Sequence, residues 1–165
     1  GVHQLIGVDP HPSAQERLKE LGGEPDTLEG MMSRAGVIVA TTGVTDLISP
    51  ELVEPRQIIL ALSNPYPEIT PEDAMQAGAA FAADGRGVNN ALAFPGMFNG
   101  ALRARARKIT GRMKIAAART IASFANVDRQ ELVPRLLNVS VHEAVTLAVE
   151  RAAFESGAVR VQEEE

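Results

Sequence analysis

Residues 37–83 read VIVATTGVTDLISPELVEPRQIILALSNPYPEITPEDAMQAGAAFAA, and this stretch decides the fold. Its three apolar runs, Val37–Thr41, Ile58–Leu62 and Ala79–Ala83, have the length and composition of buried strands. Helix start signals lie between them, at Ser49–Pro50–Glu51 and at Thr70–Pro71–Glu72–Asp73, and the second helix is expected to end at Gly78. Strands that alternate with helices predict a parallel sheet covered by helices on both faces.

The same alternation extends toward the N-terminus. Gln4–Asp9 is expected to form a short buried strand, and Ser13 with Glu16 predicts a capping box that opens a helix ending at Gly22–Gly23. Asp26 and Glu29 repeat this start signal for a second short helix.

Toward the C-terminus the pattern becomes purely helical. Residues 98–125 are rich in Ala and Arg at helical spacing, and Gly111 is expected to divide them into two helices. Ser140 with Glu143 predicts the cap of a last helix, Val141–Ser156, which Gly157 closes. The chain is therefore expected to be a single α/β domain, residues 1–165, with a partial Rossmann-like parallel sheet, flanking helices and additional C-terminal helices.

Composition excludes several classes of protein. The chain of 165 residues has no cysteine, which excludes disulfides and thiolate metal sites. No apolar run approaches the roughly 20 residues needed to span a bilayer, and no secretory signal is visible, so a cytoplasmic protein without membrane contact is expected. The stretch between Asp84 and Asp128 holds eight basic residues and no acidic one, which is compatible with an anion site, a solvated face or a subunit contact. Its few aromatic residues argue against nucleic acid.

In parallel sheets, ligands bind beyond the carboxyl ends of the strands, and candidate residues follow four of the expected strands. Asp9 would hydrogen-bond an adenosine ribose and disfavour the 2′-phosphate of NADP, or it only caps a turn. Thr42–Gly43 allows close approach to the backbone, and Asn64 offers both an amide donor and an acceptor. Asn89–Asn90 could bind a carboxylate or cap a helix.

Other catalytic and metal-binding signals are missing from the sequence. The phosphate-binding pattern G-x-G-x-x-G does not occur, and His3, His11 and His142 have no partners at metal-ligand spacing. We therefore assign no catalytic residue and no metal ligand to this chain.

Two motifs resemble the NAD-binding domain of malic enzymes: ALSNPYPEITPEDAMQAGA (Ala61–Ala79) and VNNALAFPGMFNGAL (Val88–Leu102). Residues Met113–Ala122 and the closing helix through Arg160 are similar to the same family. The resemblance implies oxidative decarboxylation of malate to pyruvate and CO2 with NAD, or with NADP, and with Mg or Mn bound by residues outside this chain.

The resemblance also implies roles for individual residues. Asn64 would lie beside the nicotinamide ribose and malate, Asn89 or Asn90 would bind malate, with Asn90 favoured, and Asp9 would face the adenosine ribose. Thr42 and Gly43 complete the expected cofactor contacts. The family's catalytic Tyr and Lys and its acidic metal ligands match nothing here, so an N-terminal catalytic part of the same enzyme is the expected partner, in a homo-oligomer, and the isolated chain is expected to be inactive.

The alternative is a non-catalytic Rossmann-like domain for ligand sensing or assembly. A Tyr, a Lys, an acidic metal cluster and a glycine fingerprint upstream would favour the enzyme. A third possibility, another amino- or hydroxy-acid dehydrogenase, is disfavoured because the SNP and FPG motifs occur together.

Overall fold

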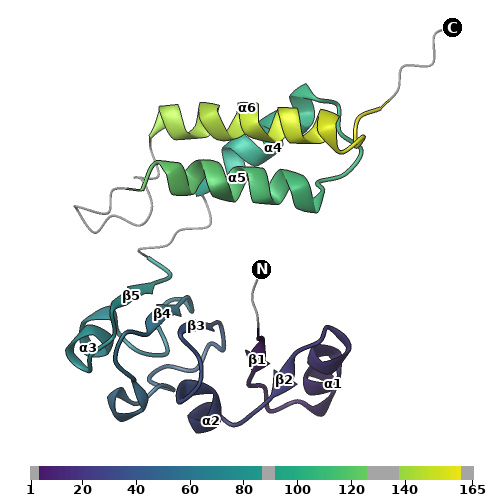
Figure 1. The fold of residues 1–165 in the computed structure, drawn as a ribbon. Helices are drawn as coiled ribbons and strands as arrows, with labels where there is room; N and C mark the ends of the chain where they lie inside the picture. The colour runs from purple at the N-terminus through teal and green to yellow at the C-terminus, as the bar shows by residue number, and fades with distance from the viewer. Residues whose placement is uncertain (1–3, 87–91, 126–137, 161–165) are drawn as a thin grey trace, which may run out of the picture. The chain divides into compact units, whose positions relative to one another are not determined.

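The computed structural model describes residues 4–86, 92–125 and 138–160. The chain forms two compact units, Gly1–Gly87 and Val88–Glu165 (Figure 1). The first unit is α/β and the second is helical. The sequence predicts a single domain over residues 1–165. The division into two compact units does not test this, and it stays a prediction.

The first unit begins with a small parallel sheet. Strand β1 (Ile6–Gly7) pairs with β2 (Glu24–Pro25), and helix α1 (Pro12–Glu20) connects them. The predicted capping box at Ser13 is wrong, because the N-cap of α1 is His11 and Pro12 occupies the first helical position. Proline suits the first helical position because the N–H that it lacks would have no partner inside the helix.

Two further helix starts in this unit use threonine caps. Helix α2 (Leu28–Met32) is capped by Thr27, whose side chain accepts a hydrogen bond from the Gly30 N–H, so the cap lies one residue beyond the predicted Asp26. Helix α3 (Pro71–Gln76) is capped by Thr70 as predicted. The Ser49–Pro50–Glu51 signal produces a short 3-10 helix, η1 (Pro50–Leu52).

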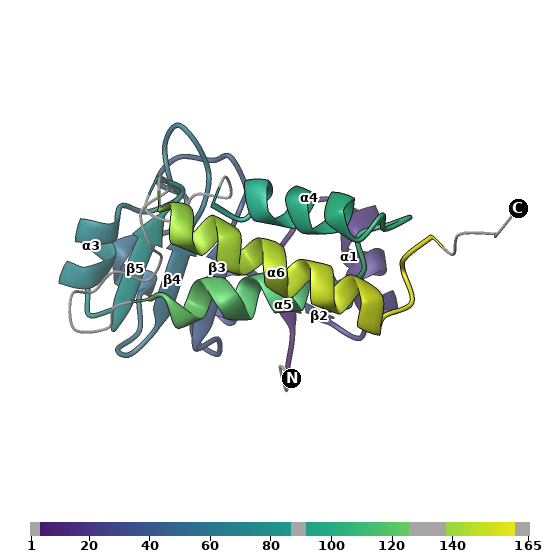
Figure 2. The ribbon, with the colours of Figure 1, turned by 90° about the horizontal axis from the view of Figure 1, so that it is seen from above.

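A second parallel sheet has the order β3-β4-β5, formed by Val37–Ala40, Ile58–Ala61 and Phe81–Asp84. The three strands lie side by side in Figure 2. The parallel sheet that the sequence predicts is thus confirmed, although it is divided from the β1–β2 pair.

One face of this sheet carries the core of the unit. Ile38 and Ala40 of β3 and Ile59 and Ala61 of β4 are buried together with residues from the surrounding helices and loops: Met32, Ile48, Val53, Ile69, Ala74 and Ala79. The alternate β3 residues, Val37 and Val39, are each 59% exposed. The expected burial of both faces is therefore not found at β3.

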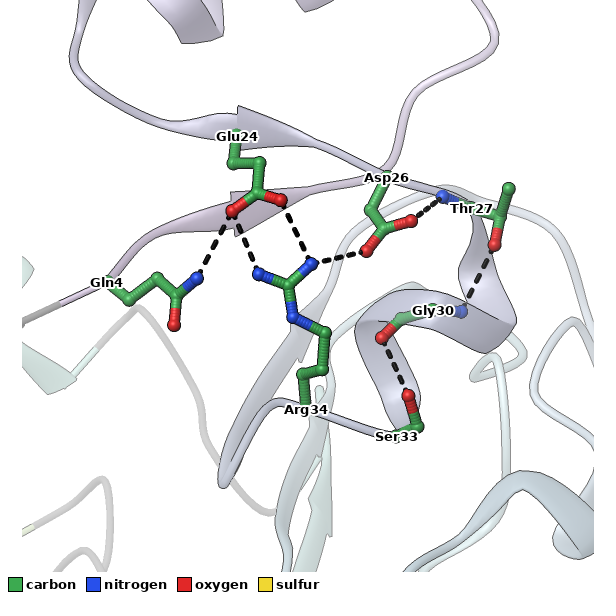
Figure 3. A network of polar contacts seen from close by, with 7 residues as sticks. All are labelled: Gln4, Glu24, Asp26, Thr27, Gly30, Ser33 and Arg34. Carbon is green, nitrogen blue, oxygen red and sulfur yellow. Dashed lines mark hydrogen bonds and ion pairs between the residues drawn. The ribbon is translucent and has the colours of Figure 1, made fainter.

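A charged network ties β2 to the segment after α2 (Figure 3). The Arg34 guanidinium donates to both carboxylate oxygens of Glu24, at 3.0 and 2.8 Å, and to Asp26 at 2.9 Å. The Gln4 side-chain amide also donates to Glu24. Hydrogen bonds from Arg34 and Gln4 lower the pKa of Glu24, and the bond to Glu24 raises the pKa of Arg34.

The second unit contains α4 (Phe94–Arg103), α5 (Gly111–Ser123) and α6 (Val139–Glu155), and α6 packs against both other helices. Gly111 opens α5, which confirms the predicted division into two helices. The predicted Ser140 cap is wrong, because Asn138 caps α6 and its side chain accepts the Ser140 N–H.

Helix α4 approaches α6 closely through two glycines. A Cβ added at Gly96 would lie 2.7 Å from the side chain of Val145, and one at Gly100 would lie 2.5 Å from the Thr146 carbonyl oxygen. The G-x-x-x-G pattern in this unit therefore serves helix packing.

Candidate functional site

The carboxyl ends of β3, β4 and β5 lie along one edge of the three-stranded sheet, because the strands are parallel and in register. The loops at this edge contain Thr42–Gly43, Ser63–Asn64 and Gly85–Arg86. Gly43 has a φ of 73°, and apart from its two chain neighbours no residue has an atom within 4 Å of the Cβ that a larger residue would carry. The backbone is thus open to close approach at this turn.

A buried carboxylate joins the first two loops. Glu68 is 0% exposed, and its Oε1 accepts hydrogen bonds from the Thr42 N–H at 2.6 Å and the Thr42 hydroxyl at 2.9 Å. The Ser63 hydroxyl donates to the same oxygen at 2.6 Å and accepts the Gly43 N–H at 2.8 Å. One side chain therefore joins the loops that follow β3 and β4.

The charge of Glu68 is stabilised by these donors. Burial raises the pKa of the carboxyl, but hydrogen bonds from Ser63 and Thr42 outweigh burial and leave the pKa below its ordinary value. Glu68 Oε2 is also buried and has no hydrogen-bond partner among the described residues. The Glu68 carbonyl accepts the Ile48 N–H at 2.9 Å, which fixes the loop itself.

The third loop contacts the second through Asn64. A Cβ at Gly85 would lie 2.6 Å from Asn64 Nδ2, so glycine is needed for the Asn64 amide to lie at this place. The Arg86 guanidinium donates to the Pro65 carbonyl at 3.2 Å, and the Asn64–Pro65 peptide bond is cis. Asn64 itself is exposed at the edge of the sheet.

Asp9 follows β1, in the other sheet of this unit, and is exposed. Its Oδ1 accepts the His11 N–H at 2.8 Å, and its carbonyl accepts the Gln15 side-chain amide at 2.7 Å. Asp9 thus caps the turn before α1, which is one of the two roles that the sequence suggests for it. The other role, a hydrogen bond to the adenosine ribose, stays a prediction.

The structure brings Thr42, Gly43 and Asn64 to one edge of the three-stranded sheet. The predicted substrate residues Asn89 and Asn90 lie outside the described residues. Their proposed meeting with Asn64 in one pocket stays a prediction.

Sequence reasoning missed Glu68. It lies inside the quoted SNPYPE motif, five residues after Ser63, but only its contact with Thr42, 26 residues away, reveals its role. The available signal in the sequence was an acidic residue between Pro67 and the apolar Ile69.

The described edge offers amide, hydroxyl and backbone groups for binding and orienting a ligand. Within residues 4–86, 92–125 and 138–160, no group of three His, Cys, Asp or Glu side chains could hold a metal ion. In the same ranges no helix is both long and apolar enough to cross a membrane.

Comparisons with known proteins place these features in context. The family model described as malic enzyme, NAD binding domain, matches residues 82–154. NAD-dependent malic enzyme 1 of Bacillus subtilis (strain 168) is 50% identical over 155 residues, which cover 93% of this chain and 35% of the relative. An NADP-dependent malic enzyme of Rhizobium meliloti (strain 1021) is 38% identical over 128 residues, or 64% of this chain and 17% of the relative.

A crystal structure of malic enzyme from Pyrococcus horikoshii Ot3 has the same fold, with a TM-score of 0.77 and 33% sequence identity. The match covers 88% of this chain and 39% of that structure. The chain thus spans between about a sixth and two fifths of the length of these relatives.

Proposed function

The chain belongs to the malic enzyme family and carries its NAD-binding domain, and we propose that it is the dinucleotide-binding part of an enzyme that oxidises and decarboxylates malate to pyruvate and CO2. The observation that carries this proposal is the edge where Glu68 joins the loops of Thr42 and Ser63 beside Asn64. Ligands of open α/β sheets bind at such carboxyl edges.

The residues at this edge fit a dinucleotide. Gly43 leaves the backbone open to a flat or charged group, and the exposed Asn64 amide would contact the nicotinamide ribose and malate. Asp9 would accept a hydrogen bond from the adenosine ribose through the oxygen that does not cap the turn. When bound, NAD or NADP supplies the hydride acceptor for malate oxidation.

The chain contributes binding and orientation, and the remaining chemistry is assigned to an N-terminal catalytic part of the same polypeptide. We assign a base, an acid and the Mg or Mn ligands to that part, because the catalytic Tyr and Lys and the acidic metal ligands that the resemblance implies match nothing in this sequence. Asn89 and Asn90 remain proposed malate contacts. A homo-oligomer in the cytoplasm is part of the same proposal.

Binding and turnover measurements test the proposal. Residues 1–165 should form no NADH from malate with Mg or Mn, while the whole natural polypeptide that carries them should do so. NADH formation by residues 1–165 alone would overturn the division of roles, and a whole polypeptide that neither binds a dinucleotide nor oxidises malate would overturn the function.

The preference for NAD over NADP is tested at Asp9. Asp9→Asn keeps an oxygen that can cap the His11 N–H but removes the charge that opposes a 2′-phosphate. Calorimetry should show NAD binding more tightly than NADP in the wild type and a smaller difference in this variant. Glu16→Gln, which removes an exposed carboxylate on α1, is the matched control and should leave the preference unchanged.

A further inference from the structure

We infer that Glu68 is a positioning residue of the dinucleotide site, whose carboxylate sets cofactor affinity by holding the β3 and β4 loops at a fixed separation. This inference rests on the proposed function. Glu68 is 0% exposed, so it acts through Thr42 and Ser63 rather than by touching the cofactor.

The geometry requires a strong acceptor. Two hydroxyls and one backbone N–H converge on the single oxygen Oε1, at 2.6 to 2.9 Å. Hydrogen bonds to an ionised carboxylate are shorter and roughly twice as strong as those between neutral groups. A neutral amide oxygen would hold the same three donors less firmly.

Through the Ser63 and Thr42 hydroxyls, Glu68 also orients the backbone of the turn at Gly43 and Val44. The Ser63 hydroxyl that donates to Glu68 also accepts the Gly43 N–H, and the Thr42 hydroxyl accepts the Val44 N–H at 3.2 Å. Both hydroxyls are therefore oriented by Glu68, and each one fixes a backbone N–H of the β3 loop. Asn64, next to Ser63, shares the β4 loop that is held in this way.

The other carboxylate oxygen makes Gln a poor substitute. Glu68 Oε2 is buried without a hydrogen-bond partner among the described residues. In Glu68→Gln, an amide NH2 must occupy that place or turn toward the three donors, so the substitution weakens the connection in either orientation.

The test compares Glu68→Gln with the wild type in the whole natural polypeptide. The KM for the dinucleotide should rise about tenfold, with a smaller change in kcat, because the variant loses charge-assisted bonds that orient the binding loops. Gln57→Ala is the matched control. Gln57 is 3% exposed and lies just before the amino end of β4, opposite the carboxyl end that forms the site. Among the described residues its side chain bonds to backbone groups of Met32, Ala35 and Glu54, so its loss should lower stability and leave the KM unchanged.

Ser63→Ala keeps the inference testable if Glu68→Gln does not fold, because it removes one donor and leaves the carboxylate in place. Its effect on KM should not add to that of Glu68→Gln in the double variant, since both break the same connection. An unchanged KM in Ser63→Ala, and in Glu68→Gln where that variant folds, would overturn the inference while leaving the proposed function intact. Failure of the wild type to use any dinucleotide would overturn both.

Discussion

Replacement of Gly100 by alanine should destabilise the helical unit. The added Cβ would lie 2.5 Å from the Thr146 carbonyl oxygen and 2.8 Å from Val149 Cβ, whereas ordinary contacts begin at 3.4 Å. Both atoms belong to the α6 helix, which cannot yield as the end of a flexible side chain could. Helices α4 and α6 must therefore separate by nearly 1 Å, and overpacking of this kind costs about 1–3 kcal/mol.

Helix propensity acts in the opposite direction. Alanine is about 1 kcal/mol more favourable than glycine within a helix. The propensity gain offsets part of the overpacking cost, so the net expectation for Gly100→Ala is a loss of about 0–2 kcal/mol in the free energy of unfolding. Urea unfolding followed by the helical circular dichroism signal measures this loss as a lower midpoint with an unchanged slope.

Gly111→Ala is the matched control. Gly111 begins α5, and apart from its chain neighbours and the backbone of its own helix no atom lies within 4 Å of the Cβ that alanine would add. This variant should be as stable as the wild type or slightly more so. If Gly100→Ala is about 1 kcal/mol more stable than the wild type, as helix propensity alone would make it, the close-packing explanation is refuted.

Three further predictions concern the α/β unit. Asn64→Ala should lower kcat/KM for malate roughly ten- to a hundredfold in the whole polypeptide, through loss of a hydrogen bond to a charged ligand; unchanged kinetics with lower stability would reduce Asn64 to a turn residue. Gln57→Leu should lower the free energy of unfolding by about 3 kcal/mol in urea titrations, since it strips partners from three backbone groups, and a loss below about 0.5 kcal/mol would contradict this. Because the pKa of Glu24 is lowered in the folded state, chiefly by its bond from Arg34, its contribution to stability is present above its unfolded-state pKa and is lost as pH falls through the folded-state pKa. Glu24→Gln should therefore flatten the acid side of the stability profile, and an identical profile would exclude this role.

The sequence predicts elements well where local chemistry decides them. The apolar runs from Val37 and Ile58 become parallel strands, and the run from Ala79 does so from Phe81 onward. The positive-φ glycines Gly22 and Gly157 follow α1 and α6. Strand β2 (Glu24–Pro25) escapes prediction, because its two residues have no apolar pattern and pair only through the tertiary contact with β1.

The wrong helix caps have a similar cause. Ser13 and Ser140 both have the capping-box spacing, yet the helices begin earlier, after His11 and Asn138. Pro12 is preorganised for the first turn, and the Asn138 side chain accepts the Ser140 N–H. Several residues near a helix start can cap it, and spacing alone does not choose between them.

The residues of the candidate site also differ in whether the sequence alone reveals them. Thr42, Gly43 and Asn64 are found from sequence because ligand-binding residues follow strand ends. Glu68 is not, since its importance comes from a contact between loops 26 residues apart. Long-range hydrogen bonds of this kind leave no periodic signal in the sequence.

β3 is an edge strand of the three-stranded sheet, and this affects how the protein associates in solution. Val37–Ala40 contains neither a charge nor a proline, and Val37 and Val39 are each 59% exposed. A strand edge of this composition can template backbone pairing with another molecule. Where no other polypeptide covers β3, residues 1–165 should therefore tend to self-associate as concentration rises.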